Sequence, residues 1–192
     1  MLLAGTATVD ITPPAGSLMA CFPRAPNREP RRAEGAHDPL QAKVLVLRDG
    51  EQVAAVVACD LCGIRKIDMS RIRARVAADV PALASERLAF ACSHSHSSVE
   101  NLYLFGNSPD DPFILVMDEK IAQAVVDAHS DLEPVRAALG TGAVELNHNR
   151  RVLNADGLAT NAWEYEEGVT TGAVDPELAV LKLVAATGRA KA

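Results

Sequence analysis

The sequence predicts a layered α/β fold in which helices pack on the faces of a mixed sheet. Three observations lead to this prediction. Strand-like and helix-like segments follow one another in the order β-β-β-α-β-α-β-β, which is typical of mixed α/β layers. Two longer segments carry apolar residues at helical spacing. Two short runs, residues 53–59 and 88–92, are apolar throughout, which predicts interior strands covered on both faces.

The first three strands are predicted from alternation and turn residues. Residues 3–11 contain alternating β-branched side chains and stop at Pro13 and Pro14, as a strand before a turn does. Residues 15–39 form an irregular segment rich in proline and arginine, and long loops in compact domains are often functional. Residues 42–60 contain two apolar runs around Asp49-Gly50, a pair that favours a β-hairpin.

Two helices and a strand are predicted next. Residues 66–79 carry apolar side chains at helical spacing, and Pro81 follows them; this pattern is typical of an amphipathic helix. Residues 88–92 are the next strand. Asp111 and Pro112 match an N-cap followed by proline at the first helical position. The second helix face then comprises Ile114, Met117, Ile121, Val125 and Ala128.

The C-terminal part is predicted to contain two strands separated by a polar segment. Residues 135–146 form one strand region, residues 147–172 are polar and irregular, and residues 176–185 form the last strand. Thr187-Gly188 then resembles a hairpin turn, and the sequence stops where a partner strand would begin. We therefore expect residues 1–192 to be a single domain that is the N-terminal part of a longer one.

Composition excludes several classes of protein. A net charge of -6 and a pI of about 5.4 argue against a nucleic-acid surface, which normally has a basic face. No apolar run approaches the length of a transmembrane helix. The N-terminus lacks the basic and apolar regions of a signal peptide, so a cytoplasmic location is expected, with a missing leader left open. Four cysteines are too few for a disulfide scaffold.

His94 and His96 are the first candidate metal ligands. Residues i and i+2 of a strand face the same side, about 6.6 Å apart, so both imidazoles could reach one cation. They continue the apolar run 88–92 at its carboxyl end, where ligand sites of open α/β sheets lie. The alternative is a solvated strand end with two incidental histidines, because H-x-H is a short motif.

His37 and Asp60 are the next candidates. A zinc site needs at least three protein ligands, and His37 could be the third; otherwise it is a loop histidine beside an Asp38-Pro39 turn. Asp60 ends an apolar run, where a carboxylate is costly unless paired or metal-bound, and it could orient a ligand histidine. Cys59 and Cys62 lack a second C-x-x-C pair, which favours small buried core residues.

Arg150 and Arg151 are candidate anion-binding residues. Their guanidinium groups could clamp a carboxylate or phosphate of a substrate, or could pair with Glu145 or Asp156. The sequence contains no nucleophile elbow, P-loop or Rossmann fingerprint.

Six stretches taken together resemble the N-terminal domain of the neutral/alkaline (non-lysosomal) ceramidases and their bacterial relatives. They occur in the same order and spacing along nearly the whole chain. The stretches are AGTATVDITPPAG at 4–16, GAHDPLQAKVLVLRDG at 35–50, CDLCG at 59–63, SHSHSS at 93–98, NHNRRV at 147–152 and VDPELAVLKL at 174–183.

The resemblance implies a zinc-dependent hydrolase in which metal-activated water cleaves an amide or ester of a small-molecule or lipid-like substrate. It implies that His37 is one zinc ligand and that either His94 or His96 is the second. The family's remaining ligands, a glutamate and a tyrosine, would lie beyond Ala192. Asp60, Arg150 and Arg151 are the candidate catalytic residues.

Two departures from the family pattern define an alternative. The family's serine in the N-x-N-R-S stretch is replaced by Arg151, and Ser97-Ser98-Val99 stands where the family has S-G-P. The alternative is therefore a truncated or degenerate member that acts as a non-catalytic binding or interaction module. An unpaired strand edge after Lys182 would then predict a dimer.

Overall fold

A computed structural model describes residues 1–21, 29–83, 85–162 and 172–192. The chain divides into two compact units, which are described separately below. Unit 1 comprises Met1–Arg136 and Leu183–Ala192, and unit 2 comprises Ala137–Lys182. That residues 1–192 form a single domain within a longer one stays a prediction.

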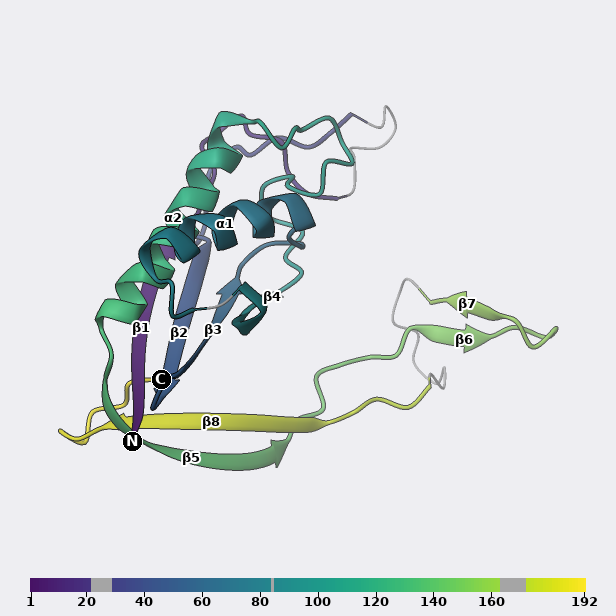
Figure 1. Cartoon of the computed structure of the whole chain (residues 1–192). Helices are drawn as coiled ribbons and strands as arrows, with labels where there is room; N and C mark the ends of the chain where they lie inside the picture. The colour runs from purple at the N-terminus through teal and green to yellow at the C-terminus, as the bar shows by residue number, and fades with distance from the viewer. Residues whose placement is uncertain (22–28, 84, 163–171) are drawn as a thin grey trace. The chain divides into compact units, whose positions relative to one another are not determined.

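A curled, mixed sheet with two helices packed on it confirms the predicted α/β class. Its strand order is β4-β3-β2-β1-β5-β8, and β4 runs parallel to β3 while the pairs β3–β2, β2–β1 and β1–β5 are antiparallel (Figure 1). The strands are β1 (Leu2–Asp10), β2 (Gln41–Asp49), β3 (Gln52–Cys59), β4 (Leu88–Cys92), β5 (Glu133–Ala143) and β8 (Glu177–Ala185).

The predicted hairpin around Asp49-Gly50 is confirmed. Asp49 pairs with Gln52 across the turn, and Gly50 has a φ of 58°, a conformation that glycine adopts without steric cost. The register places Val44 opposite Val57, and both side chains are buried. The alternation of the two runs therefore directs one face of the hairpin into the core.

Both predicted helices are confirmed as α1 (Lys66–Asp79) and α2 (Pro112–Ser130). The side chain of Asp111 caps α2, because its carboxylate accepts hydrogen bonds from the backbone N–H groups of Phe113 and Ile114 at 2.9 and 3.3 Å. Pro112 occupies the first turn, where its missing N–H costs nothing. The buried faces of both helices belong to the same core cluster as β2 and β3.

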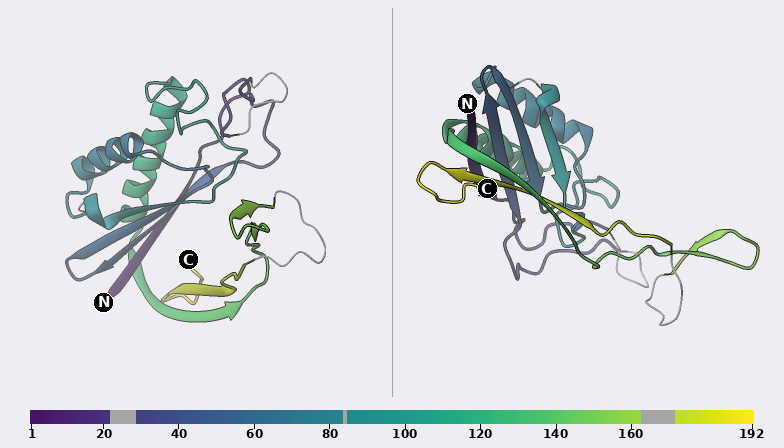
Figure 2. Two further views of the ribbon diagram at one scale, coloured as in Figure 1. Left: turned by 90° about the vertical axis from the view of Figure 1, so that its right-hand side faces the viewer. Right: turned by 90° about the horizontal axis from the view of Figure 1, so that it is seen from below.

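The expectation that residues 53–59 and 88–92 are covered on both faces is wrong. β3 alternates strictly between exposed and buried residues, and Val56 on its outer face is 46% exposed. β4 pairs only with β3, so it is an edge strand of the sheet. Figure 2 shows both helices on the same side of β1–β4. The apolar outer face consists largely of alanine, and a run of alanines does not reveal whether anything covers it.

Unit 2 contains a small hairpin that the sequence did not predict. β6 (Arg151–Leu153) pairs with β7 (Ala159–Asn161) in an antiparallel two-stranded sheet. In its turn, Asn154 Oδ1 accepts hydrogen bonds from the backbone N–H groups of Asp156 and Leu158 at 3.1 and 2.8 Å. Side-chain bonding of this kind stabilises a turn without any apolar alternation. No helix in the described part of the chain is long and apolar enough to cross a bilayer.

Candidate functional site

Three segments of unit 1 meet beyond the carboxyl ends of β3 and β4. Because these strands are parallel and Cys59 is in register with Cys92, the segments that follow them emerge at the same edge of the sheet. The backbone N–H of Ser93 donates to the carbonyl oxygen of Cys59 at 3.0 Å. Residues 18–21 join this edge through an isolated bridge between Met19 and Val99.

His94 and His96 lie together, although they do not continue the strand as expected, because β4 ends at Cys92. Their ring centroids are 4.9 Å apart in an edge-to-face arrangement. His94 Nδ1 donates to the carbonyl oxygen of Cys62 at 2.6 Å. Because a carbonyl can only accept, the proton of a neutral His94 ring resides on Nδ1, which leaves Nε2 as an acceptor. His94 has a φ of 59°, a strained backbone for a non-glycine residue.

A group of two thiols and one imidazole forms next to this pair. The Sγ atoms of Cys21 and Cys62 are 3.3 Å apart. These sulfurs and a ring nitrogen of His96 all lie within 4.8 Å of one another, the one such group of metal-binding side chains found among the described residues. Cys62 is buried, whereas Cys21 and His96 are half-buried. Thiolate and imidazole are ligands that zinc prefers.

Burial affects the thiols of this region. It raises the pKa of Cys62 to about 11, and the contact with Cys21 adds to this shift. It also raises the pKa of Cys59, a core residue of β3, to about 12. Both thiols are therefore neutral at pH 7 when no cation is present, because a thiolate loses its hydration on burial.

A guanidinium group ties two segments of the site together. Arg31 Nη2 donates to the carbonyl oxygens of Ala20 at 2.9 Å and of His96 at 2.5 Å. Ala20 precedes Cys21 in the chain, so Arg31 fixes the backbone of two members of the group at once. Charge-assisted hydrogen bonds of this kind are stronger than neutral ones.

Ser98 connects the third segment to the other two. Its Oγ accepts from the backbone N–H of Cys62 at 3.0 Å and donates to the carbonyl oxygen of Ser95 at 2.9 Å. Its carbonyl oxygen accepts from the N–H of Ala20 at 2.9 Å. Ser98 is fully buried, so these bonds hold the backbone at all three members of the group in a fixed arrangement.

His37 lies at a neighbouring pocket rather than in the group of three. It lines a pocket of about 380 Å³ with residues from both predicted metal-binding segments, including Ser97. The His37 side chain is 97% exposed, and its Nδ1 is 2.8 Å from a carboxylate oxygen of Asp38. The pocket thus brings the 35–40 segment beside residue 97, while His37 is not a member of the thiol–imidazole group.

The other candidate residues have identifiable local contacts. Asp60 follows β3, and its Oδ2 accepts from the backbone N–H of Gln41 at 3.0 Å, which fixes the start of β2. Arg150 and Arg151 belong to unit 2, where the carbonyl oxygen of Arg150 accepts from the N–H of Ala162 at 2.8 Å. The proposed catalytic roles of all three residues stay predictions.

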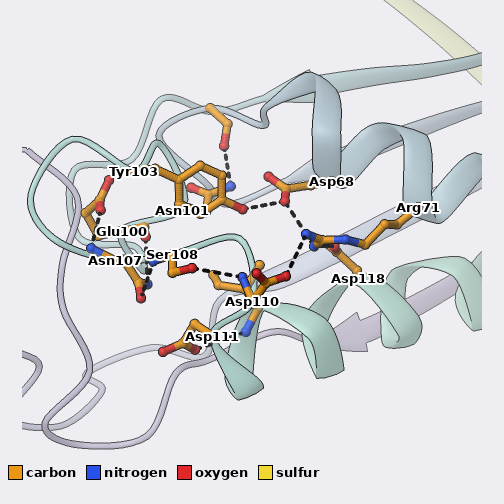
Figure 3. A network of polar contacts seen from close by, with 12 residues as sticks. Asp68, Arg71, Glu100, Asn101, Tyr103, Asn107, Ser108, Asp110, Asp111 and Asp118 are labelled. Carbon is orange, nitrogen blue, oxygen red and sulfur yellow. Dashed lines mark hydrogen bonds and ion pairs between the residues drawn. The ribbon is translucent and has the colours of Figure 1, made fainter.

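A buried carboxylate organises the loop that follows the histidines (Figure 3). Glu100 is fully buried, and its two carboxylate oxygens accept from backbone N–H groups at distances of 3.1–3.4 Å. The donors are Leu102, Leu104, Phe105 and Asn107. Asn101 Nδ2 donates to the carbonyl oxygen of Gly63 at 2.7 Å, so the loop is attached to the segment that carries Cys62.

A second polar cluster joins this loop to both helices (Figure 3). Tyr103 Oη donates to Asp68 of α1, and Arg71 bridges Asp68 and Asp118 of α2, with Nη1 2.9 Å from Asp118 Oδ2. Burial raises the pKa of Asp118 to about 6, and the nearby charge of Asp68 adds to this shift. Burial also raises the pKa of Asp68. These contacts therefore link the loop around Glu100 to both α1 and α2.

Comparison with known proteins identifies a fold shared with ceramidases. No family model matches the sequence, and no curated protein matches it. The crystal structure of neutral ceramidase from Pseudomonas aeruginosa superposes with a TM-score of 0.73 at 21% identity, over 98% of this chain and 30% of that chain. A structure of ceramidase complexed with C2 gives a TM-score of 0.75 at 22% identity, again over 98% and 30%.

These comparisons confirm the sequence resemblance at the level of the fold. At such identities the likeness concerns architecture alone, and the chain spans about 30% of the length of the ceramidase chains it matches. The ceramidase-like fold places residues 93–98 at the edge of the sheet where the thiol–imidazole group lies.

The sequence did not predict that Cys21 and Cys62 lie beside His96 in one group of metal-binding side chains. Cys62 was predicted as a small core residue, and it is indeed buried, but its sulfur faces Cys21 instead of packing only against apolar side chains. The two residues are separated by 41 positions, and no local pattern marks such a pair. The one available signal was that Cys62 closely follows the predicted strand that ends at Asp60.

Proposed function

We propose that the chain is part of a metal-dependent hydrolase that resembles neutral ceramidase and cleaves an amide or ester bond in a small-molecule or lipid-like substrate. The observation that carries the proposal is the position of His96. Its ring nitrogen lies within 4.8 Å of two thiol sulfurs at the carboxyl edge of a sheet whose fold matches ceramidase structures over 98% of the chain.

The donor set fits zinc. Two sulfurs and an imidazole nitrogen are borderline-soft ligands, and three protein ligands with an open position are typical of catalytic zinc sites. When bound, zinc would supply a Lewis acid and a water of lowered pKa. His96 belongs both to this group and to the ligand set that the resemblance implies, in which His37, beside the neighbouring pocket, takes the place of the two thiols. The resemblance implies further ligands beyond Ala192.

We assign the following roles to the remaining candidate residues. His94 orients the site, because its Nδ1–H bond to the carbonyl oxygen of Cys62 fixes both its own ring and the backbone of a neighbouring thiol. Asp60 holds the start of β2 at the same sheet edge. Arg150 and Arg151 would hold a polar group of the substrate. A cytoplasmic location is part of the proposal, since it would keep the cysteines reduced.

Metal content and hydrolysis test this function. In the polypeptide that the gene encodes, we expect zinc by elemental analysis and chelator-sensitive hydrolysis of an N-acyl lipid amide, restored by added zinc. His96→Ala should reduce kcat/KM by more than the ten- to hundredfold typical of outer-shell substitutions. His129→Gln, on α2 and outside the group, is the matched control. Chelator-resistant hydrolysis, or full activity in the His96 variant, would refute the metal-dependent mechanism.

A second candidate function is a non-catalytic binding module. Arg151 favours it, because the resemblance assigns a catalytic serine to that position. In this case the protein binds metal and an N-acyl lipid amide without turnover. The substitution Arg151→Ser distinguishes the two, because hydrolysis gained by the variant alone would identify the natural protein as a degenerate member.

A further inference from the structure

Among the described residues, Cys21 and Cys62 are the two cysteines whose thiols are in contact. Their Sγ atoms are 3.3 Å apart, although 41 positions separate the residues in the sequence. We propose that this pair is a redox-sensitive modification site, which a peroxide converts into one disulfide and a dithiol reductant opens again. The inference goes beyond the proposed function, because it requires neither a bound metal nor hydrolysis.

The contact between the two sulfurs selects this pair for a disulfide. A disulfide bond is about 2.05 Å long, so bond formation needs an approach of about 1.3 Å from the distance in the reduced chain. Cys59 and Cys92 are also neighbours, since they are in register on β3 and β4. Cys59 is only 2% exposed within the core, however, so it is shielded from a dissolved oxidant.

The two thiols differ in exposure, which gives each a separate part in the reaction. Cys21 is half-buried, so a peroxide reaches its sulfur from solvent, whereas Cys62 is 3% exposed. Cys21 is therefore the sulfur that is oxidised first, and Cys62 is the sulfur that resolves the oxidised product. His94 Nδ1 lies 3.7 Å from Cys62 Sγ, and an N–H group at this position stabilises negative charge that develops on the sulfur during its attack.

The reaction balances in two steps. The sulfur of Cys21 attacks the O–O bond of hydrogen peroxide, an S–O bond forms, and hydroxide leaves with the thiol proton as water. The sulfur of Cys62 then attacks the sulfur of the Cys21 sulfenic acid, so that the S–S bond forms and the S–O bond breaks. The hydroxyl group leaves with the proton of Cys62 as a second water. The two thiols lose two electrons and the peroxide gains them, and a dithiol returns two electrons and two protons when it opens the disulfide.

The backbone on both sides of the pair is fixed by a buried side chain. Ser98 is fully buried, its Oγ accepts from the N–H of Cys62 at 3.0 Å, and its carbonyl oxygen accepts from the N–H of Ala20 at 2.9 Å. These bonds keep the two segments adjacent, so each thiol has a high effective concentration at the other. Exposed disulfides are reduced more readily than buried ones, and the half-buried position of Cys21 therefore suits a reversible bond.

Oxidation would also change the group of metal-binding side chains. A sulfur in a disulfide is not a thiolate ligand, so the group would lose both sulfurs and retain only His96. This consequence alone rests on the proposed function. It predicts that peroxide abolishes chelator-sensitive hydrolysis and that dithiothreitol restores it.

Peroxide treatment of the reduced 192-residue chain, kept in a metal chelator, tests the site. We expect a mass loss of two hydrogen atoms per chain, a linked peptide pair that contains Cys21 and Cys62, and complete reversal by dithiothreitol. Cys62→Ser should stop at a sulfenic acid on Cys21 that dimedone traps. Cys92→Ser, which changes a half-buried cysteine outside the pair, should form the same disulfide as the natural chain. A folded chain that forms no disulfide, or links other cysteines, would overturn the inference.

The natural chain alone keeps the test decisive where a variant fails to fold. Under native conditions the Cys21–Cys62 linkage should dominate. In urea the same oxidation should spread linkages over several pairs of cysteines, because the contact that selects this pair is lost. The same mixture of linkages under both conditions would show that the fold does not select the pair, and the inference would be wrong.

The outcomes separate this inference from the proposed function. Failure of disulfide formation overturns the redox site and leaves the metal-dependent hydrolase intact. A reversible disulfide that leaves chelator-sensitive hydrolysis unchanged would confirm the redox site and exclude the two thiols from the catalytic metal site.

Discussion

At Gly5, strand β1 lies directly against the last turns of α2. A Cβ atom at position 5 would lie 1.9 Å from the carbonyl oxygen of Ala128, far inside van der Waals contact. Gly5→Ala must therefore push the helix away from the sheet, and we expect it to lower the free energy of unfolding by about 1–3 kcal/mol or more. Urea denaturation measures this change.

Gly35→Ala is the matched control for this prediction. A Cβ atom at position 35 would meet no atom within 4 Å, so the free energy of unfolding should change by no more than about 0.5 kcal/mol. Equal unfolding midpoints for the position-5 variant and the natural chain would show that the helix and strand can separate freely there.

Whether a contact between two site residues could be predicted depends on how far apart the residues lie in the sequence. His94 and His96 were expected to share a face because a strand places residues i and i+2 on one side. They do lie together, but β4 ends at Cys92 and His94 has a φ of 59°, so a turn and not strand alternation brings the rings together. Cys21 and Cys62 could not be paired from the sequence, because their contact depends on how the irregular segment before β2 returns to the sheet edge. The same holds for Glu100, whose burial depends on backbone N–H groups of a loop that has no periodic signal.

At the scale of elements, the ionisable cluster between α1 and α2 makes stability depend on pH. Asp118 is 4% exposed, and burial raises its pKa from 3.8 to about 6. Between these values the folded chain binds more protons than the unfolded chain, so this group stabilises the fold at low pH and the stabilisation is lost as pH rises through about 6. The loss amounts to about 3 kcal/mol.

Comparison of variants isolates this contribution. Urea denaturation between pH 4 and pH 7 should give a flatter pH dependence for Asp118→Asn than for the natural chain, because an amide does not titrate. Asp156→Asn, an exposed residue in the β6–β7 turn, should leave the pH dependence unchanged. Identical pH profiles for the natural chain and the Asp118 variant would mean that Asp118 titrates alike in the folded and unfolded states.

Most helices and strands could be predicted because the patterns that define them lie within a few residues of the sequence. The neighbours that pack against each strand could not be predicted in this way. The Asp49-Gly50 turn, the Asp111 cap and the helical spacing in α1 are each contained within a few residues. Whether β3 and β4 are covered on one face or two depends on what packs against them, and alanine-rich strands are compatible with either. The β6–β7 hairpin was missed because its turn is stabilised by Asn154 instead of by apolar alternation.

At the scale of the whole molecule, the core belongs entirely to unit 1. Every residue of the core cluster lies within Met1–Arg136, and no described residue of Ala137–Lys182 is buried. Hydrophobic burial provides most of the driving force for folding. Unit 1 should therefore supply nearly all of the cooperative unfolding transition.

Two deletions test this distribution of stability. Replacement of residues 137–182 by a flexible Gly/Ser linker of about ten residues should preserve a single cooperative transition in urea. Removal of residues 183–192 should be far more damaging, because it deletes buried Leu183 and Lys191, whose Nζ lies 2.6 and 2.8 Å from carboxylate oxygens of Asp131 and Glu133. The Lys191 side chain is only 2% exposed, whereas Asp131 and Glu133 are 48% and 34% exposed, so the damage comes mainly from the loss of buried apolar surface of Leu183 and of the lysine stem. If the linker variant were unfolded while the truncated chain remained stable, unit 2 would hold the stabilising contacts, and the assignment of the core to unit 1 would be wrong.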